Sequence, residues 1–213
     1  VSAINGDLWL VVNNSGKIWV VDSSSFKIKH EITGFSSPRY ALKVSDEKVF
    51  VSDLFGGVIS VVDLTTFKIE TTIPLTGWTE KMVLAGAKAW ITNRNTDQLY
   101  IVDPYKFEVE DSVSLRMHGG TIFQDVNTAD LFVLCEARWD LSTQACIYRL
   151  DPQARQVVDS VEFPLGKAVN FLTQSPDGAN LYYASEGLHK IATTPLSMSQ
   201  TPIHSLEGLS TYG

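Results

Sequence analysis

A segment of about 40 residues recurs along this chain, and this repeat constrains the fold more than any other feature of the sequence. Each copy contains a short apolar strand that ends in Asp, as in Trp19-Val20-Val21-Asp22 and Ser60-Val61-Val62-Asp63. The same pattern ends at Asp103 and at Asp151, and Ala192 takes the Asp position in a degenerate fifth copy. An aromatic residue follows each of the first three Asp residues at a constant spacing: Phe26, Phe67 and Phe107. A unit of this size cannot bury both of its faces alone, so neighbouring units must cover each other.

Each unit contains the pattern of four short strands. One strand opens the unit after a Gly-containing turn, a second precedes the Asp-terminated strand, and an alternating strand follows the aromatic residue, as at 40–44, 49–52 and 67–73. Helical periodicity of useful length is missing from the sequence. The sequence therefore predicts an all-β fold, a β-propeller of four-stranded antiparallel blades that form a single domain over 1–213. The predicted blades are 1–33, 34–75, 76–115, 116–163 and 164–207, and 208–213 is predicted to start a further repeat.

The two ends of the chain bear on how many blades the ring contains. Residues 1–12 read as the second strand of a blade whose first strand is missing, and 208–213 repeats the opening seen at 34–37. Two arrangements fit these ends, a closed ring of five blades or part of a larger ring. We favour part of a larger, seven-bladed ring, although an open ring would leave sheet edges exposed.

Several motifs resemble a known repeat family. They are Trp90-Ile91-Thr92-Asn93, Leu99-Tyr100-Ile101-Val102-Asp103 and Ser175-Pro176-Asp177-Gly178. Together they resemble the YVTN-type β-propeller repeats of bacterial surface-layer-like and other cell-envelope proteins. The blade openings at 37–40 and 77–82 resemble those of gut-bacterial outer-surface propeller lipoproteins, some of which capture vitamin B12 for a transporter. The resemblance implies an exported protein of the periplasm or outer cell surface.

Composition excludes several function classes. The 24 acidic and 17 basic residues give a net charge of −7 without a basic cluster, which argues against nucleic-acid binding. No apolar run approaches the roughly 20 residues of a membrane-spanning helix, so no transmembrane segment is expected. The sequence has no P-loop, nucleophile elbow or dinucleotide fingerprint, and its four His residues lack metal-ligand spacing, so no cofactor and no metal are expected. The recurring Asp residues are expected to cap hairpin turns.

Aromatic and charged residues concentrate in the loops at one end of the predicted blades, in the loops that open the first strand and those that join the second and third strands. Exposed aromatic and Arg side chains flanked by polar groups are typical of binding surfaces. For a single aromatic such as Trp78 or Tyr40, burial between blades is an equally good interpretation. The predicted ligand-binding residues are Arg39, Tyr40, Phe55, Trp78, Asn93, Arg94, Arg138 and Trp139.

The loop that holds Arg138 and Trp139 is longer than its counterparts, and an insertion that the fold does not require often carries function. Cys135 and Cys146 bracket this loop on adjacent strands. The pair is interpreted either as a disulfide of an exported protein or as two buried thiols.

We therefore expect a non-enzymatic binding module that captures a small ligand, of the corrinoid or glycan class, or an envelope protein partner. Stacking on aromatic faces and hydrogen bonds from Arg39, Arg94 and Asn93 would hold the ligand in a preformed surface. The alternatives are a lyase or hydrolase with His118 as base and Glu80 or Glu136 as its partner, and a pure surface scaffold.

Overall fold

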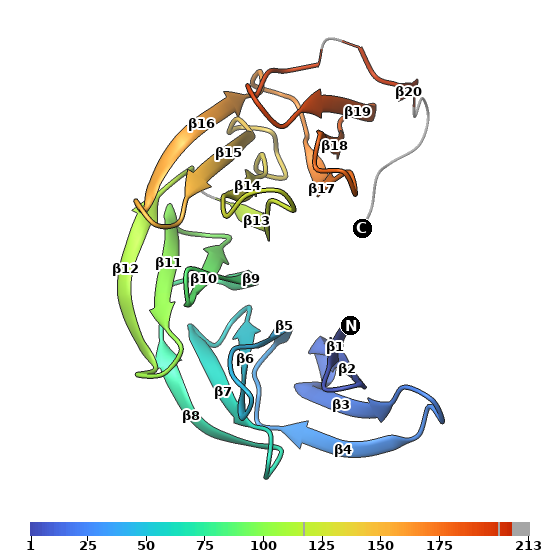
Figure 1. Ribbon diagram of the computed structural model, residues 1–213, viewed down its shortest axis with the longest axis vertical. Coiled ribbons are helices and arrows are strands. Elements are labelled where there is room, and N and C mark those ends of the chain that lie inside the picture. The colour runs from blue at the N-terminus through green and yellow to red at the C-terminus, as the bar shows by residue number, and fades with distance from the viewer. Residues whose placement is uncertain (117, 200, 206–213) are drawn as a thin grey trace. The chain divides into compact units, whose positions relative to one another are not determined.

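The computed structural model describes residues 1–116, 118–199 and 201–205 (Figure 1). Apart from a short 3-10 helix, η1 (Asn13–Ser15), the described elements are β-strands. They form five four-stranded antiparallel sheets, and each sheet takes its strands in chain order. The prediction of an all-β propeller built from four-stranded antiparallel blades is confirmed. The segment 208–213, predicted to start a further repeat, lies outside the described residues.

The five sheets are named the first to fifth blades in chain order, and each lies within one of the predicted ranges. The first blade contains β1 (Ser2–Ile4), β2 (Asp7–Val12), β3 (Lys17–Asp22) and β4 (Ile28–Thr33). The second contains β5 (Pro38–Lys43), β6 (Lys48–Asp53), β7 (Val58–Asp63) and β8 (Lys68–Pro74). The third contains β9 (Thr79–Ala85), β10 (Lys88–Asn93), β11 (Gln98–Asp103) and β12 (Glu108–Ser114). The fourth contains β13 (Gly119–Gln124), β14 (Leu131–Cys135), β15 (Cys146–Asp151) and β16 (Gln156–Glu162). The fifth contains β17 (Asn170–Gln174), β18 (Asn180–Ala184), β19 (Gly187–Ala192) and β20 (His204–Ser205).

The expectation that the first blade lacks its first strand was wrong. Strand β1 pairs with β2 in the register Ser2↔Trp9 to Ile4↔Asp7. Asn5 and Gly6 join the two strands with φ angles of 52° and 83°. Consecutive positive φ values at Asn-Gly are typical of a tight two-residue hairpin turn, and this dipeptide is the signal that identifies the strand.

The chain divides into two compact units, Val1–Ser112 and Val113–Gly213, which are described separately. In the first unit, apolar side chains fill the space between successive blades. Trp9 and Ile18 of the first blade pack with Val49 and Val51 of the second. Phe50 of the second blade packs in the same way against the third, with Ala89, Ile91 and Val102.

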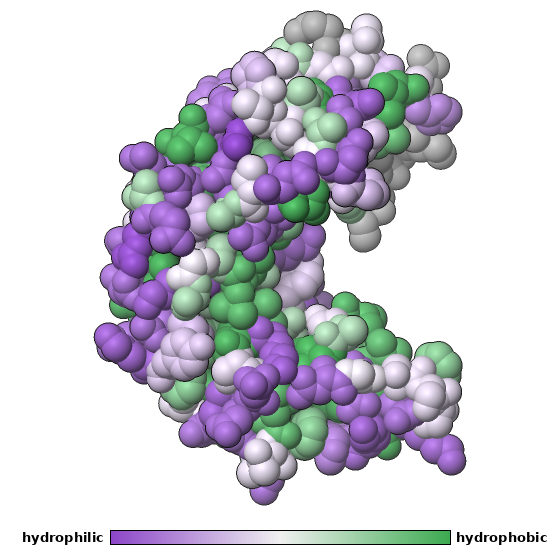
Figure 2. Space-filling model, viewed as in Figure 1, coloured by the Kyte–Doolittle hydropathy of each residue, from purple (hydrophilic) through white to green (hydrophobic). Residues whose placement is uncertain are grey.

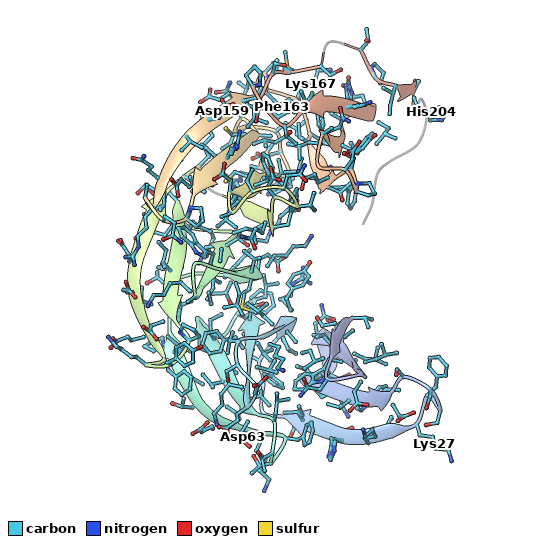
Figure 3. The ribbon with its side chains drawn as sticks, in the orientation of Figure 1. Lys27, Asp63, Asp159, Phe163, Lys167 and His204 are labelled. Atoms are coloured by element: carbon cyan, nitrogen blue, oxygen red, sulfur yellow. The ribbon has the colours of Figure 1, made fainter. Side chains whose placement is uncertain are left out.

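The second unit repeats this arrangement between the fourth and fifth blades. Phe132 and Ile147 belong to one buried cluster with Leu181 and Tyr183. Phe163, labelled in Figure 3, closes the cluster with its ring centroid 5.1 Å from that of Tyr183. The core therefore lies between blades, as the repeat predicts.

The recurring Asp residues cap the hairpins that lead to the outer strands. Asp63, labelled in Figure 3, accepts hydrogen bonds from the backbone N–H groups of Thr65 and Thr66 at 2.9 and 2.8 Å. Asp22, Asp103 and Asp151 make the equivalent pairs of bonds. The prediction that these carboxylates are turn caps is confirmed.

The aromatic residue after each of the first three Asp residues has a left-handed backbone, with φ between 53° and 56° at Phe26, Phe67 and Phe107. Phe67 stacks on His30 of the preceding blade with ring centroids 3.7 Å apart, and Phe107 contacts Phe50 at 6.1 Å. In the first blade, Phe26 is 72% exposed. The aromatic position therefore serves the contact with the preceding blade.

The fourth strands form a polar exterior. Residues 108–112 of β12 are all exposed, and in Figure 2 the surface over β8 and β12 is largely hydrophilic. Because the apolar contacts run between blades, the loops at the two ends of each blade are where side chains can vary.

Candidate functional site

In an antiparallel blade, the loop that leads into the first strand and the loop that joins the second and third strands lie at the same end. In the second blade, Asp53 ties these two loops together. Its buried carboxylate accepts hydrogen bonds from the backbone N–H groups of Ser36 and Ser37 on one loop, and of Phe55 and Gly56 on the other. The loop that carries Phe55 is therefore fixed from inside the blade.

Asn93 does the same in the third blade. Its Oδ1 accepts from the backbone N–H groups of Trp78, Asn95 and Thr96 at 3.0 to 3.2 Å, and its Nδ2 donates to the Thr76 carbonyl at 2.6 Å. Asn93 was predicted to contact ligand, but the structure buries its side chain and directs its amide into the two loops. Its role in any site is to position Trp78.

Glycine is needed beside this anchor. Gly77 has a φ of 90°, and a Cβ there would stand 2.4 Å from Oδ1 of Asn95 and 2.6 Å from Oδ1 of Asn93. The close approach lets Asn95 accept a 2.7 Å hydrogen bond from the Trp78 N–H. The Trp78 N–H therefore has two acceptors, Asn93 Oδ1 and Asn95 Oδ1, which fix the backbone of the loop at this residue.

Arg39 and Glu80 join the second and third blades at the same end. Glu80 is buried, and its two oxygens accept from Nη2 and Nε of Arg39 at 2.7 and 2.8 Å. The hydrogen bonds to Glu80 raise the pKa of the Arg39 guanidinium, although its partial burial opposes the shift. Arg94 extends the cluster, with Nη1 3.8 Å from the same carboxylate. Two guanidinium groups therefore share one buried carboxylate.

A third cation lies beside this pair. The ring of Tyr40 has Lys81 Nζ 5.8 Å from its centroid and Arg39 Cζ 5.9 Å from its centroid, both within the range of cation–π attraction. Arg39 and Tyr40 come from β5, and Glu80 and Lys81 from β9. We call Arg39, Lys81 and Arg94, with Glu80 and Tyr40, the cation cluster.

Two exposed aromatics stand on the loops next to the cation cluster. Phe55 is 63% exposed and Trp78 is 42% exposed, and their rings meet edge to face with centroids 5.7 Å apart. The Trp78 carbonyl accepts a 2.9 Å hydrogen bond from the N–H of Arg94, so the aromatic pair and the cation cluster share a loop framework. We call Phe55 and Trp78 the aromatic pair.

The remaining predicted ligand-binding residues, Arg138 and Trp139, belong to the second unit. Trp139 is 87% exposed. Its loop is shaped by Arg138, whose N–H donates to Thr143 Oγ1 at 2.8 Å and whose Nε lies 3.5 Å from Asp140. The structure thus brings Arg39, Tyr40, Phe55, Trp78 and Arg94 together within one unit and places Arg138 and Trp139 in the other.

The site contains two residues that were not among the predicted ligand-binding residues, Glu80 and Lys81. A signal for Glu80 was present in the sequence. Positions 39 and 80 are equivalent in successive blades, since the residues before them pair with Asp53 and Asn93, and they carry opposite charges. Opposite charges at equivalent positions of adjacent repeats predict an ion pair between blades.

His118 and Glu136, the base and one candidate partner of the enzymatic alternative, lie opposite each other beside the Gly119↔Cys135 pair. The N–H of Glu136 donates to the His118 carbonyl at 3.0 Å, which pairs the two residues through their backbones. Glu80, the other carboxylate considered as a partner, is bonded through both oxygens to Arg39. Over the residues that the structure describes, no group of three His, Cys, Asp or Glu side chains could hold a metal ion.

Cys135 and Cys146 are directly opposite each other on β14 and β15, and both are buried thiols in the structure. Burial raises the pKa of Cys146 to about 11 and raises that of Cys135 further. Burial also raises the pKa of Tyr148 on the same strand, whose hydroxyl accepts from the N–H of Arg116 at 3.2 Å.

The far end of the second and third blades has open depressions of about 470 and 380 Å³, lined by turn residues such as Asp46 and Tyr105. Their lysines are paired, Lys43 with Asp46 and Lys48 with Asp63 and Glu70. Tyr105 and Phe107 line the smaller of these depressions, and the aromatic pair lines neither of them. No helix of the described chain is long and apolar enough to cross a membrane.

Comparison with known proteins supports the fold alone. No protein-family model matches the sequence, and no curated protein matches it. The structure is similar to hydrazine synthase of Kuenenia stuttgartiensis, with a TM-score of 0.77 and 14% identity over 87% of this chain and 54% of that one. It is also similar to the dihydro-heme d1 dehydrogenase NirN in complex with DHE, with a TM-score of 0.65 and 11% identity over 86% of this chain and 41% of that one.

The chain therefore spans about half of the first of these proteins and less of the second. The resemblance to YVTN-type repeats finds no matching family model and stays a prediction, as does the number of blades in the ring. At the level that the comparisons reach, the chain is an all-β propeller.

Proposed function

We propose that this propeller is a binding module, and that the loop surface of its first unit captures a small ligand on the aromatic pair. The exposure of Phe55 and Trp78 side by side carries the proposal. Leaving two large aromatic rings in water forgoes the free energy of burial, and such exposed apolar groups next to polar ones mark interaction sites.

The loop framework supports the same conclusion. Asp53 and Asn93 hold the loops through buried hydrogen bonds, so the aromatic rings are presented before any ligand arrives. Binding to a preformed surface loses less entropy than binding that must first order its loops. The structure of NirN with DHE is a precedent for a small ligand on a similar fold. We extend the proposal, as the repeat resemblance implies, to an exported protein of the bacterial envelope with a corrinoid or a glycan as ligand.

The test is a thermal-shift screen with cyanocobalamin, a porphyrin dicarboxylate and a set of neutral oligosaccharides. A ligand at 100 times its dissociation constant adds about 2.7 kcal/mol of stability, which shifts Tm by about 5–11 °C for a protein of this size. We expect the shift to be lost in Trp78→Ala and strongly reduced in Phe55→Ala.

Tyr105→Ala is the matched control, because Tyr105 is an exposed aromatic, 73% accessible, at the opposite end of the third blade. This variant is expected to keep the full shift. Trp139→Ala tests whether the long loop of the second unit takes part. A shift that survives Trp78→Ala and Phe55→Ala would overturn the proposed site.

A further inference from the structure

We infer that the groove at the far end of the second and third blades is a second binding site, and that its ligand is a small organic cation, an ammonium group on a hydrocarbon body. The groove consists of the two depressions of about 470 and 380 Å³, which adjoin because Ser45, Asp46 and Tyr105 line both. It lies between the β5–β6 turn and the β11–β12 hairpin, at the end of the blades opposite the aromatic pair. The inference therefore does not rest on the proposed function.

The third blade contributes an exposed tyrosine that the fold does not require. Tyr105 is 73% exposed, and its N–H donates to the turn-capping Asp103 at 2.9 Å. The equivalent residues of the first, second and fourth blades, Ser24, Thr65 and Gln153, donate the same backbone hydrogen bond. The capping bond thus needs no aromatic ring at this position, and the ring of Tyr105 gives this groove an apolar surface that the other hairpins lack at that position.

The second blade contributes a turn that presents two carboxylates. Ser45 Oγ accepts hydrogen bonds from the backbone N–H groups of Glu47 and Lys48 at 3.3 and 3.1 Å, so the turn is formed before any ligand arrives. Asp46 and Glu47 stand at its tip, and both are exposed. The corresponding turns of the first and third blades have two residues and no acidic side chain. The acidic turn is therefore a feature of this groove and not of the repeat.

The lysines that line the groove leave its negative charge uncompensated. Lys48 lies 2.6 Å from each of two carboxylates of its own blade, Asp63 and Glu70. Lys43 pairs with Asp46 at 3.0 Å, but the Asp46 side chain is fully accessible, and an exposed pair of this kind is easily exchanged for another partner. Neither lysine therefore neutralises the carboxylate of Glu47, and the groove favours a cation.

The hydrogen-bonding groups of the groove fit a ligand that only donates. Carboxylates accept, whereas an ammonium group has donors and no acceptor. A carboxylic acid or a phosphate would be repelled by Asp46 and Glu47, and a sugar would have to use its hydroxyl groups as donors alone. An ammonium group is attracted by these carboxylates and by the face of an aromatic ring, and its hydrocarbon body can cover Tyr105. Volumes of this size are typical of small-molecule sites.

Three probes of similar shape separate charge from apolar contact. Phenethylamine, phenethyl alcohol and hydrocinnamate share a phenyl body and carry a positive, a neutral and a negative group. Amide chemical shifts of the full chain, measured by NMR at low and at moderate salt, give the dissociation constants and locate the probe. We expect the amine to bind about threefold or more tightly than the alcohol, with a preference that falls as salt rises, and hydrocinnamate to bind most weakly. The amine should shift the N–H signals of Asp46, Glu47 and Tyr105.

The decisive variants are Glu47→Gln, which removes an exposed charge, and Tyr105→Thr, which introduces the residue of the second blade and so keeps the hairpin. Glu47→Gln is expected to weaken the amine about twofold or more and to leave the alcohol unchanged, whereas Tyr105→Thr should weaken both. Asp97→Asn is the matched control, because it removes an exposed carboxylate at the opposite end of the third blade.

Equal affinities of the amine and the alcohol, or amine affinity unchanged in Glu47→Gln, would overturn the inference. Loss of amine binding in Trp78→Ala would also overturn it, because the amine would then rest on the aromatic pair. Amine binding that survives Trp78→Ala supports it and leaves the proposed function to its own test. The probes chosen for the aromatic pair carry no ammonium group, so Tyr105→Ala remains the control there.

Discussion

At the scale of single residues, the loop surface depends on two buried polar side chains that occupy equivalent positions. Asp53 ends β6 and Asn93 ends β10, and each satisfies backbone N–H groups of two loops. An amide offers fewer acceptor sites than a carboxylate but adds a donor, which Asn93 uses on the Thr76 carbonyl. The second blade therefore fixes its two loops with a carboxylate, and the third blade fixes the equivalent loops with an amide.

We predict that Asp53→Ala destabilises the protein by about 3 kcal/mol or more, because several buried N–H groups lose their acceptor. Asp53→Asn is the matched variant, since the third blade uses Asn at this position. It should cost clearly less. Urea unfolding at neutral pH measures both, and equal losses for the two variants would show that the hydrogen bonds to Asp53 are not what holds the loops.

At the scale of strands and hairpins, the sequence pattern predicted those features whose stabilising contacts form between residues close together in the chain. The turn caps at Asp22 and Asp63 were predicted because their hydrogen bonds close within a few residues of the Asp. The strand β1 was missed because three residues carry almost no periodicity, although Asn5-Gly6 marks its turn.

The candidate site was predicted only in part for a related reason. Tyr40, Phe55, Trp78 and Arg94 were identified from residue type and loop position. The bonds between Arg39 and Glu80 join residues far apart in the chain, so their geometry depends on how two blades pack. Asn93 was predicted to contact ligand because the residue type alone does not show whether an amide side chain in a loop is buried, as this one is.

The facing cysteines of β14 and β15 give a prediction at this scale. Residues directly opposite in an antiparallel pair have Cα atoms about 4.5–5.5 Å apart, within the range of disulfides. We predict that protein recovered from an oxidising compartment has Cys135 and Cys146 joined, the two thiols having given two electrons and two protons to a disulfide donor. Intact mass after unfolding and alkylation without reductant measures this. Alkylation of both residues would contradict the prediction.

At the scale of the whole molecule, the first three blades each have a turn-capping Asp whose pKa is lowered, so their effects on stability in acid add together. The pKa values of Asp63 and Asp103 are lowered to about 2, chiefly by hydrogen bonds from Lys48 and Lys88 and then by those of the turn backbone. The pKa of Asp22 is lowered as well, mainly by the Ser24 hydroxyl. One blade after another thus carries a carboxylate that is charged more readily in the folded state than in the unfolded chain.

A carboxylate whose folded pKa is depressed contributes stability above its unfolded pKa, near 4, and loses that contribution as the pH falls toward 2. We therefore expect unfolding midpoints in urea to fall through this window. The double variant Asp63→Asn/Asp103→Asn should be less stable at neutral pH, with a shallower acid fall. Asp46→Asn removes a fully accessible carboxylate and serves as control. An unchanged slope in the double variant would contradict the assignment.

The left-handed phenylalanines after Asp22, Asp63 and Asp103 have a consequence for changing this protein in the laboratory. Phe67 and Phe107 contact the blade before their own, while Phe26 has most of its ring in water. The hairpin of one blade thus packs against the blade before it. Transplanting a single four-stranded sheet would separate Phe67 from His30, or Phe107 from Phe50. Shuffling or transplanting these repeats should therefore move each sheet together with the hairpin of the sheet that follows it.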